Sequence, residues 1–452
     1  MELLSHWEID PGGCEFRMTT DGKTAIVLGA YGLIGSACVS LLKSEGFRVV
    51  GVGRSLTEGR RCDPDIDWLE RDIATTPKET WSADFANADV VINTSGALQT
   101  GRQDNLRRIH EDAITQLVDG LEDLTVRFIQ ISAVGVSENA TTEFLRSKKR
   151  GENIITHSNL DWIILRPTLV MGPQAYGGSA MLRATAAIPL IGIRILPDTP
   201  VQTVFVEDVA RAIVQAARGE IATHTIAELT EASAQTFDTL VEIIRAWQGF
   251  SPWKVKVTIP KPVIRAVGFG ADVLGWLGWR SPLRTTALKA LEDGIVGNPE
   301  TWVAAGGMPC RPLTETLRAI PATAHERWFA RLYLLLPLGV AVLAAFWIMS
   351  GLIGILSRQE AQTLLTDNGL PQSIAALYVI GGSIIDTVLG LAILYRPWTR
   401  YACLGLVAMS AVYLIGGTIW TPYIWADPLG PFPKVLPGMV LALFVAALLE
   451  KR

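Results

Sequence analysis

The pattern of apolar and polar positions divides the chain into two parts. Up to about residue 320, short apolar runs alternate with segments in which apolar residues recur at helical spacing. This alternation predicts strands joined by helices, and therefore a doubly wound parallel α/β sheet with helices on both faces. From Arg331 onward, long uncharged apolar runs replace this pattern. Because a helix that spans a bilayer needs about 20 apolar residues, the second part predicts an all-α transmembrane domain.

Six apolar runs predict the main strands of the sheet, at 23–28, 47–52, 68–73, 89–96, 126–132 and 161–167. Helices are expected at 103–122 and 237–248, and a short late strand at 203–206, after which Asp208 would cap the next helix. An apolar helical stretch at 262–279 favours either a lid over a substrate pocket or a helix at a membrane interface.

Three glycines follow the first strand, where the chain must turn from strand into helix. Gly29, Gly32 and Gly35 are spaced three apart, and a second strand follows the helix. Glycines in this context let the backbone approach a pyrophosphate, to which the helix N-terminus presents free N–H groups. The pattern predicts a Rossmann-like dinucleotide site rather than an ordinary tight turn. The other residues of the turn that we expect to contact the cofactor are Tyr31, Leu33 and Ile34.

The end of the second strand indicates which cofactor binds. Arg54 stands where an NAD-preferring site usually carries Asp or Glu for the ribose hydroxyls. Its planar guanidinium suits a 2′-phosphate, so NADP(H) is the preferred cofactor and NAD(H) the second choice, unless Arg54 is only a solvated surface residue. The ends of the other strands supply the remaining expected contacts, which are Asp72, Ile73, Thr94, Ser95, Gly96 and Pro167.

Several motifs together resemble the short-chain dehydrogenase/reductase superfamily. The resemblance covers roughly residues 24–230 and is strongest to its extended and atypical branches. These branches are the NAD-dependent epimerase/dehydratase group, NmrA-like proteins and the 39-kDa accessory subunit of respiratory complex I. The motifs are the glycine turn, Ser132-Ala-Val-Gly135, Arg146-Ser147-Lys148, Leu165-Arg166-Pro167 and Phe205-Val-Glu-Asp208-Val-Ala.

The resemblance implies a catalytic Ser, Tyr and Lys, with the Tyr four residues before the Lys on one helix face. Lys148 matches the Lys and Ser132 the Ser, but Phe144 stands at the Tyr position. A phenyl ring cannot transfer a proton. Three alternatives follow: Tyr176 supplies the proton, Lys148 itself does so, or the domain binds the nucleotide without turnover.

Four apolar runs predict the membrane helices, at about 332–356, 371–395, 401–420 and 433–449. Their layout, with Asp386 in the second run and Arg396 and Arg400 after it, resembles the DoxX-like membrane family. An ionisable residue within a span, such as Asp386, either contacts a proton or quinone headgroup or makes a packing hydrogen bond. The expected domains are therefore an N-terminal extension at 1–22, with Met18 as an alternative start, a nucleotide-binding domain at 23–320 whose substrate subregion begins near 171, and a membrane domain at 326–452.

The placement of Lys and Arg predicts the orientation of the membrane helices, since cytoplasmic loops carry the excess of positive charge. One set of loops and ends carries six cations and the opposite loops carry two. We therefore expect a multi-pass inner-membrane protein with the nucleotide-binding domain and both termini in the cytoplasm. The first set is Arg327, Arg331, Arg396, Arg400, Lys451 and Arg452, and the second is Arg358 and Lys434.

The composition argues against nucleic-acid binding, a metal site and a membrane haem. The net charge of −4 provides no basic face for nucleic acid, and the five cysteines form no CxxC pair, so no metal site is expected. None of the five histidines lies in a predicted span, which argues against a membrane haem. The mean hydropathy of +0.30 is high, and the excess comes from the last third of the chain.

These observations favour a membrane-anchored NAD(P)-dependent oxidoreductase that acts on a small lipophilic carbonyl or quinone-like substrate. Its other partner is the lipid bilayer, and a membrane protein partner or a homo-oligomer is left open. The first alternative is a catalytically inactive redox sensor or assembly subunit, which Phe144 favours. The second is that the DoxX-like part is the working unit and the nucleotide-binding domain regulates it.

Overall fold

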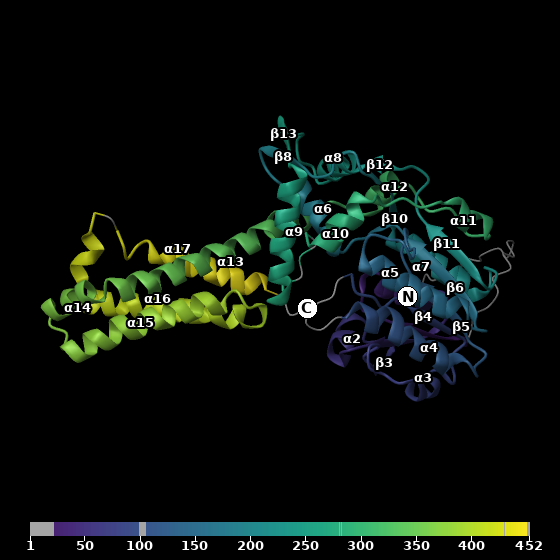
Figure 1. Ribbon diagram of the computed structural model, residues 1–452, viewed down its shortest axis with the longest axis horizontal. Helices are drawn as coiled ribbons and strands as arrows, with labels where there is room; N and C mark the ends of the chain where they lie inside the picture. The colour runs from purple at the N-terminus through teal and green to yellow at the C-terminus, as the bar shows by residue number, and fades with distance from the viewer. Residues whose placement is uncertain (1–21, 99–104, 280, 282, 429, 450–452) are drawn as a thin grey trace, which may run out of the picture.

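The structure, a computed structural model, describes residues 22–98, 105–279, 281, 283–428 and 430–449. Figure 1 shows a sheet-containing lobe and a bundle of long helices that projects from it. All but the last residue of the predicted extension 1–22, and the start of the predicted helix 103–122, lie outside the described residues.

The sheet has seven parallel strands in the order β11-β6-β5-β4-β1-β2-β3. This order confirms the doubly wound fold, because the strands progress outward in both directions from β1. The six predicted strands are present, although β3 ends at Glu70 because a turn begins at Asp72, whose carbonyl accepts the N–H groups of Thr75 and Thr76. The strands are β1 Thr24–Leu28, β2 Arg48–Gly53, β3 Asp67–Glu70, β4 Val90–Asn93, β5 Arg127–Ile131, β6 Asp161–Pro167 and β11 Thr225–Leu229.

Helices cover both faces of this sheet and enclose two apolar cores. One core lies beneath α1 (Leu33–Ser44) and α7 (Val206–Arg218), and the other beneath α3 (Lys78–Phe85), α4 (Ala113–Leu121) and α5 (Glu143–Thr156). The central strands are buried on both sides, which is why their sequences are continuously apolar rather than alternating. The short helix α2 (Leu56–Cys62) follows β2, and a π-helix, Arg108–Asp112, leads directly into α4.

The prediction that Asp208 caps a helix is wrong. Because β10 (Thr203–Phe205) runs directly into α7, the N-cap is Phe205 and Asp208 lies in the first turn. Its buried carboxylate accepts hydrogen bonds from the N–H (2.9 Å) and Nε (2.8 Å) of Arg311. Asp208 therefore fastens residues near the end of this lobe to α7.

The rest of this lobe consists of short elements that cover the C-terminal edge of the sheet. The predicted helices at 237–248 and 262–279 are present as α8 (Phe237–Trp247) and α9 (Lys261–Trp276). The others are β7 Leu169–Met171, α6 Gly177–Ala186, β8 Ile191–Arg194, β9 Pro200–Val201, β12 Gln235–Thr236, β13 Val255–Thr258, α10 Thr285–Glu292, α11 Glu300–Ala304 and α12 Leu313–Ala319.

Three helices of the second lobe are long and apolar enough to cross a membrane: α13 (Ala324–Leu356), α15 (Gln372–Ala392) and α16 (Arg396–Trp420). The fourth predicted span forms α17 (Val435–Leu448), which has 14 residues. A helix of that size is about 21 Å long and therefore shorter than the roughly 30 Å hydrocarbon core. A polar helix that the sequence did not indicate, α14 (Arg358–Asp367), separates α13 from α15.

Asp386 is buried in the middle of α15 and joins three helices. Its carboxylate accepts hydrogen bonds from Ser350 Oγ on α13 (3.1 Å) and Tyr413 Oη on α16 (2.9 Å). Ser383 and Thr387, its neighbours on α15, instead donate to backbone carbonyls one turn earlier. The contacts of Asp386 are therefore those of the packing alternative, with partners on other helices.

The two lobes meet at a buried ion pair. The Nη1 of Arg183, on α6, lies 2.9 Å from the Oε2 of Glu326, in the first turn of α13. The Arg183 side chain is fully buried, and its guanidinium also donates to the carbonyls of Gly172 (2.6 Å) and Pro173 (3.3 Å). Helix α13 is thus joined to the loop that follows β7.

Candidate functional site

The glycine turn has the geometry that a dinucleotide site requires. Gly29 has φ +74°, in the left-handed region that favours glycine, and its N–H donates to the carbonyl of Val52. Gly32 is the N-cap of α1, and a Cβ at Gly35 would overlap the Gly29 carbonyl oxygen. Helix α1 therefore starts directly above the end of β1, and its first N–H groups, which begin at Leu33 and Ile34, have no intrahelical acceptor.

Tyr31 lies over the end of β2 beside Arg54. Its hydroxyl accepts a hydrogen bond from the Arg54 N–H (3.0 Å), and a Cβ at Gly53 would overlap its ring. The Arg54 residue is exposed. The structure thus brings Tyr31, one of the predicted cofactor contacts of the turn, to Arg54, the residue predicted for the 2′-phosphate, and Tyr31 holds the backbone from which the Arg54 side chain extends.

Asp72 and Ile73 follow β3 beside the same edge, since the N–H of Arg71 donates to the Gly53 carbonyl (2.9 Å). The Asp72 carboxylate accepts the N–H of Ala74 (3.0 Å), so it stabilises the turn. Both residues therefore lie next to the end of β2, and the Asp72 carboxylate is engaged by the backbone of its own turn.

The segment after β4 joins the glycine turn to the predicted catalytic residues. Thr94 Oγ1 donates to the carbonyl of Leu28 (2.7 Å), and a Cβ at Gly29 would lie 3.0 Å from Ser95 Oγ. A Cβ at Gly96 would lie 3.9 Å from the Nζ of Lys148. Thr94, Ser95 and Gly96 therefore form a path along the C-terminal edge of the sheet, from the glycines to the lysine.

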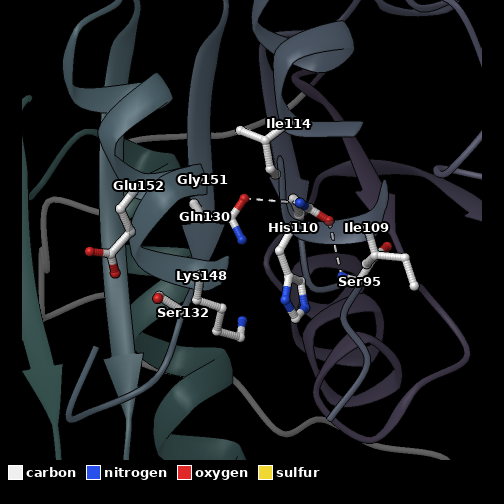
Figure 2. A pocket seen from close by; sticks show the side chains of 10 residues that line it. Ser95, Ile109, His110, Ile114, Gln130, Ser132, Lys148, Gly151 and Glu152 are labelled. Carbon is white, nitrogen blue, oxygen red and sulfur yellow. Dashed lines mark hydrogen bonds between the residues drawn. The ribbon is translucent and has the colours of Figure 1, made fainter. Parts of the chain in front are cut away.

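Lys148 and Ser132 line one small cavity (Figure 2), beside the carboxyl ends of β4 and β5. The Lys148 Nζ donates to the carbonyl of Ile131 (3.2 Å), and Figure 2 shows its side chain extending toward His110. The Ser132 hydroxyl is buried and has no hydrogen-bond partner within the described part of the chain. Pro167 is buried at the end of the neighbouring β6, where its carbonyl accepts the N–H of Val134 (3.2 Å).

Burial lowers the pKa of Lys148 to about 8, because it disfavours the charged ammonium, while the nearby Glu152 carboxylate acts in the opposite direction. Glu152 lines the same cavity and accepts a bidentate pair of hydrogen bonds from Arg166, from Nε (3.0 Å) and Nη2 (2.5 Å). Lys148 is thus a group that can gain or lose a proton near neutral pH.

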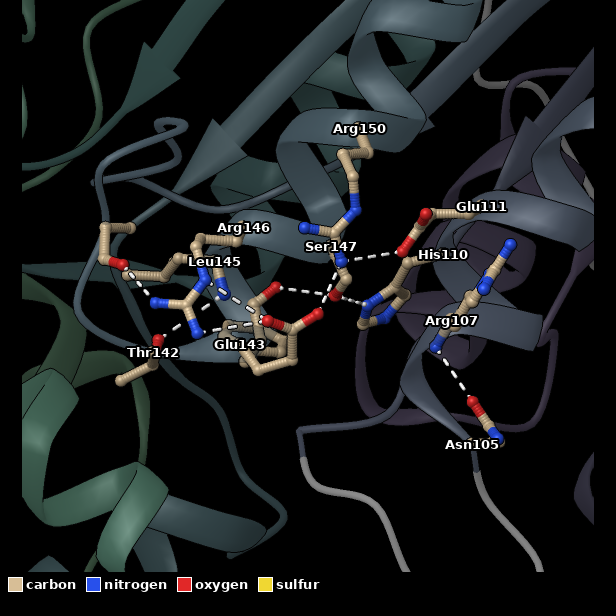
Figure 3. A network of polar contacts seen from close by, with 12 residues as sticks. Asn105, Arg107, His110, Glu111, Thr142, Glu143, Leu145, Arg146, Ser147 and Arg150 are labelled. Atoms are coloured by element: carbon tan, nitrogen blue, oxygen red, sulfur yellow. Dashed lines mark hydrogen bonds and ion pairs between the residues drawn. The ribbon is translucent and has the colours of Figure 1, made fainter.

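Phe144 lies near both His110 and Lys148. Its ring centroid is 5.7 Å from that of His110, in an edge-on contact, and 5.7 Å from the Lys148 Nζ. Two further contacts hold His110. Its Nδ1 is 2.9 Å from Ser147 Oγ (Figure 3). Its Nε2 accepts the Ala97 N–H at 3.4 Å. Burial, together with the charge of Lys148, lowers the His110 pKa to about 3, so this imidazole is neutral at physiological pH.

Ion pairs fix α5 against the π-helix that carries His110. Arg150 Nη2 lies 2.8 Å from the Oε1 of Glu111 and also contacts Glu143 (Figure 3). Arg146, one turn after Glu143 on α5, forms a further ion pair with Glu143. Thr142 caps α5, because its hydroxyl accepts the Leu145 N–H (3.4 Å). These contacts position the helix on which both Phe144 and Lys148 stand.

The prediction from sequence missed four polar residues that line the cavity: His110, Asn93, Gln130 and Glu152. Asn93 Nδ2 donates to Gln130 Oε1 (2.9 Å), and Gln130 Nε2 donates to the Ile131 carbonyl that Lys148 also uses. For Asn93 and Gln130 the available signal was an uncharged polar residue in a mostly apolar strand. His110 and Glu152 lie on helices and gave no such signal.

Tyr176 is not brought to this cavity. It is the N-cap residue of α6, its side chain is 56% exposed, and it is absent from the lining residues. The structure therefore favours Lys148 over Tyr176 as the group nearest to the predicted reaction site.

Family comparisons agree with this architecture. Residues 29–220 match the NAD(P)H-binding family model, and residues 344–443 match the DoxX-like family. The chain joins an NAD(P)H-binding, epimerase/dehydratase-like domain to a DoxX-like C-terminal region, and both predicted resemblances are confirmed.

Individual relatives are distant. The chain is 23% identical over 277 residues to a ceramide reductase of Caulobacter vibrioides, covering 61% of this chain and 84% of that one. It is 26% identical over 286 residues to NADH dehydrogenase [ubiquinone] 1 alpha subcomplex subunit 9 of Arabidopsis thaliana, covering 57% and 65%. The Bordetella bronchiseptica enzyme WbmH, solved in complex with NAD+, shares the fold with a TM-score of 0.50 at 18% identity, over 66% of this chain and 97% of WbmH.

Proposed function

We propose that the protein is a membrane-anchored NAD(P)-dependent oxidoreductase that reduces a lipophilic carbonyl or quinone-like substrate. The observation that carries this proposal is that Lys148 and Ser132 line one cavity beside Gly96, at the same sheet edge as the glycine turn. The similar Caulobacter protein is named for the reduction of a lipid, and the apolar helices of this chain would keep the site close to a bilayer.

The residues at the sheet edge suit a nicotinamide dinucleotide. Gly35 lets α1 pack closely on the turn, and Gly32, the N-cap of α1, carries no side chain where a pyrophosphate would approach the helix. Arg54 would pair with a 2′-phosphate, and Lys148 would hold the nicotinamide ribose. When bound, this cofactor supplies a hydride to the substrate carbon.

The chain's own residues would supply the proton and the orientation. The buried Ser132 hydroxyl, which lacks a partner in the described residues, would donate to the substrate oxygen. The Lys148 ammonium would transfer a proton to the same oxygen as the carbonyl becomes an alcohol, and solvent would return a proton to the amine. A pKa of about 8 matches this role, since a general acid works best when its pKa is near the operating pH.

The alternative function is a redox sensor or assembly subunit that binds the nucleotide without turnover. Phe144 favours it, because its ring, 5.7 Å from the Lys148 Nζ, stands at the position of the reductases' tyrosine and cannot transfer a proton. The similarity to a subunit of NADH dehydrogenase favours it as well.

A turnover assay separates the two. The full-length protein in detergent or nanodiscs is incubated with NADPH and a panel of quinones and long-chain ketones, and the absorbance of NADPH is followed. Oxidation that depends on one substrate class supports the oxidoreductase. Tight NADPH binding without oxidation of NADPH by any substrate of the panel would contradict the oxidoreductase and support the sensor.

Arg54→Asp is expected to reverse the cofactor preference from NADPH toward NADH. The aspartate would repel the 2′-phosphate and accept hydrogen bonds from the ribose hydroxyls instead. A charge-assisted hydrogen bond is worth about 1.5–3 kcal/mol, so the NADPH affinity should fall by roughly ten-fold to more than a hundred-fold. Titration of both nucleotides into both proteins measures the change, and Arg60→Asp on α2 is the control for net charge. An unchanged ratio of affinities would remove Arg54 as the determinant.

The proposed orientation places the nucleotide-binding domain and both termini in the cytoplasm. Reporter fusions after Leu356 and after Trp420 should therefore be periplasmic, and fusions after Tyr395 and at the C-terminus cytoplasmic. The fusion at the C-terminus tests whether the short α17 completes a fourth span, because a periplasmic reporter there would mean that α17 does not cross. A cytoplasmic reporter at Trp420 would contradict this topology.

A further inference from the structure

Helix α9 exposes an apolar face. Its buried positions are Ile264, Gly268, Ala271 and Gly275, which lie one helical turn apart on a single side. The opposite side carries large apolar residues, of which Phe269 is 68% and Trp276 is 78% exposed. The others on that side are Val263, Val267, Val273 and Leu274. A contiguous apolar surface of this kind marks an interaction site.

The position of α9 at the end of the helical bundle indicates what its apolar face contacts. Trp279 Nε1, just beyond α9, donates to the Leu394 carbonyl at the end of α15 (2.7 Å), and the Arg396 N–H donates to the Leu277 carbonyl (3.0 Å). Figure 1 shows α9 running across the axes of α13, α15 and α16 at the end of the bundle that faces the sheet lobe. A helix that crosses the end of membrane-spanning helices lies along the bilayer surface, where an apolar face and Trp are favoured.

A cavity of about 490 Å³ lies between α9 and α10. Its apolar lining comes from Leu196, Ile264 and Leu288, and its volume is in the range of small-molecule sites. Its charged and polar lining consists of Lys261, Arg265, Lys289, Glu292 and Thr285.

The charge of the cavity is positive. Lys261 Nζ pairs with Glu292 Oε1 (2.6 Å), which neutralises one of the three cations. Arg265 also acts on the Glu292 carboxylate from a longer distance, but within the described residues neither Arg265 nor Lys289 makes a direct ion pair. The acid on α9, Asp272, is bound by Arg284 (2.9 Å) and Thr285 (2.5 Å) and so holds α9 against α10. Two cations therefore remain for a ligand.

We propose that the cavity between α9 and α10 binds the anionic headgroup of a membrane phospholipid while the apolar face of α9 rests on the cytoplasmic leaflet. Arg265 and Lys289 would contact the phosphate of this headgroup. This site is separate from the nucleotide site, although Asp293, directly after α10, contacts Thr141 next to α5. The proposal does not require turnover.

The test measures lipid binding to the full-length protein by native mass spectrometry after exchange into mixed micelles. Phosphatidylglycerol is compared with phosphatidylcholine, and Arg265→Gln/Lys289→Gln with the unchanged protein. Each cation near an anionic lipid surface is worth about 1 kcal/mol, so the double variant should bind phosphatidylglycerol roughly thirty-fold more weakly. The control is Lys254→Gln/Arg318→Gln, which makes the same change of charge at two exposed residues away from the cavity.

Three outcomes would overturn the proposal. They are equal affinity for the two lipids, an equal loss in the control variant, and displacement of phosphatidylglycerol by inorganic phosphate at an equal concentration, which would indicate an anion site without a lipid.

A second measurement tests the apolar face of α9 without altering the charges of the cavity. A photo-crosslinking amino acid in place of Phe269 should label lipid, and one in place of Val255, which is exposed on β13, should not. Equal labelling at both positions would also overturn it.

Discussion

Gly32→Val is expected to abolish binding of both NADPH and NADH. Gly32 is the N-cap of α1, and a Cβ there would stand 3.1 Å from the Gly29 carbonyl, so the valine side chain would project over the helix start. A pyrophosphate could then no longer reach the first N–H groups of the helix. We expect the affinity for both nucleotides to fall below the detection limit of calorimetric titration.

The variant should nevertheless fold, because Gly32 is exposed and has an ordinary φ of −75°. Thermal unfolding of the nucleotide-free protein checks this, and Ser40→Val, at an exposed position two turns further along α1, is the matched control. Retained nucleotide affinity in a folded Gly32→Val protein would show that the glycine turn is not the binding site.

The glycine turn could be predicted because its signal is local. Strand, glycines, helix and second strand lie within one stretch of chain, and each residue type has a physical reason there: Gly29 needs a left-handed φ and Gly35 has no room for a Cβ. The apolar strands were predictable for a similar reason. Burial on both faces of the sheet makes each strand a continuous apolar run.

The contacts around Lys148 could not be predicted in the same way, because residues far apart in sequence make them. His110 reaches Phe144 and Ser147 from a π-helix, whose extra residue per turn shifts the side chains away from the periodicity that sequence patterns follow. Asn93 and Gln130 become neighbours only when β4 and β5 pair. A single polar residue in an apolar strand does not reveal its partner.

Charged residues gave the least information at the sequence level. Asp208 was expected to cap a helix and instead binds Arg311, 103 residues later. Glu326 stands just before an apolar run and has no local sign that its partner is the buried Arg183. Burial of such a pair depends on the whole tertiary structure, and removal of one partner would leave the other charge uncompensated.

Position 148 decides whether the site is catalytic. If Lys148 donates the proton, Lys148→Ala should lower kcat by about 10²–10⁴-fold, the usual contribution of a general acid. Lys149→Ala, the next residue on the same helix, should leave kcat unchanged. Phe144→Tyr should keep or raise kcat, because it adds only a hydroxyl to a ring that already lies 5.7 Å from the Lys148 Nζ.

The pH dependence gives the same hypothesis a second test. The proton donor must be the ammonium form, and the pKa of Lys148 is about 8. We therefore expect kcat/KM to be constant below this pH and to decrease as the pH rises through about 8, as the amine loses its proton. His110, whose pKa is about 3, is neutral throughout and should not contribute to the profile.

A sensor would respond differently to the same variants. Neither Lys148→Ala nor Phe144→Tyr would then create or remove NADPH oxidation, but Lys148→Ala should still weaken NADPH binding through the lost ribose contact. One hydrogen bond is worth about 0.5–3 kcal/mol, so the affinity should fall between roughly two-fold and a hundred-fold. Affinity and turnover measured in both variants therefore distinguish the two functions. If Lys148→Ala changed neither quantity, Lys148 would have no part in the site, and the match of α5 to the catalytic helix of the reductases would be wrong.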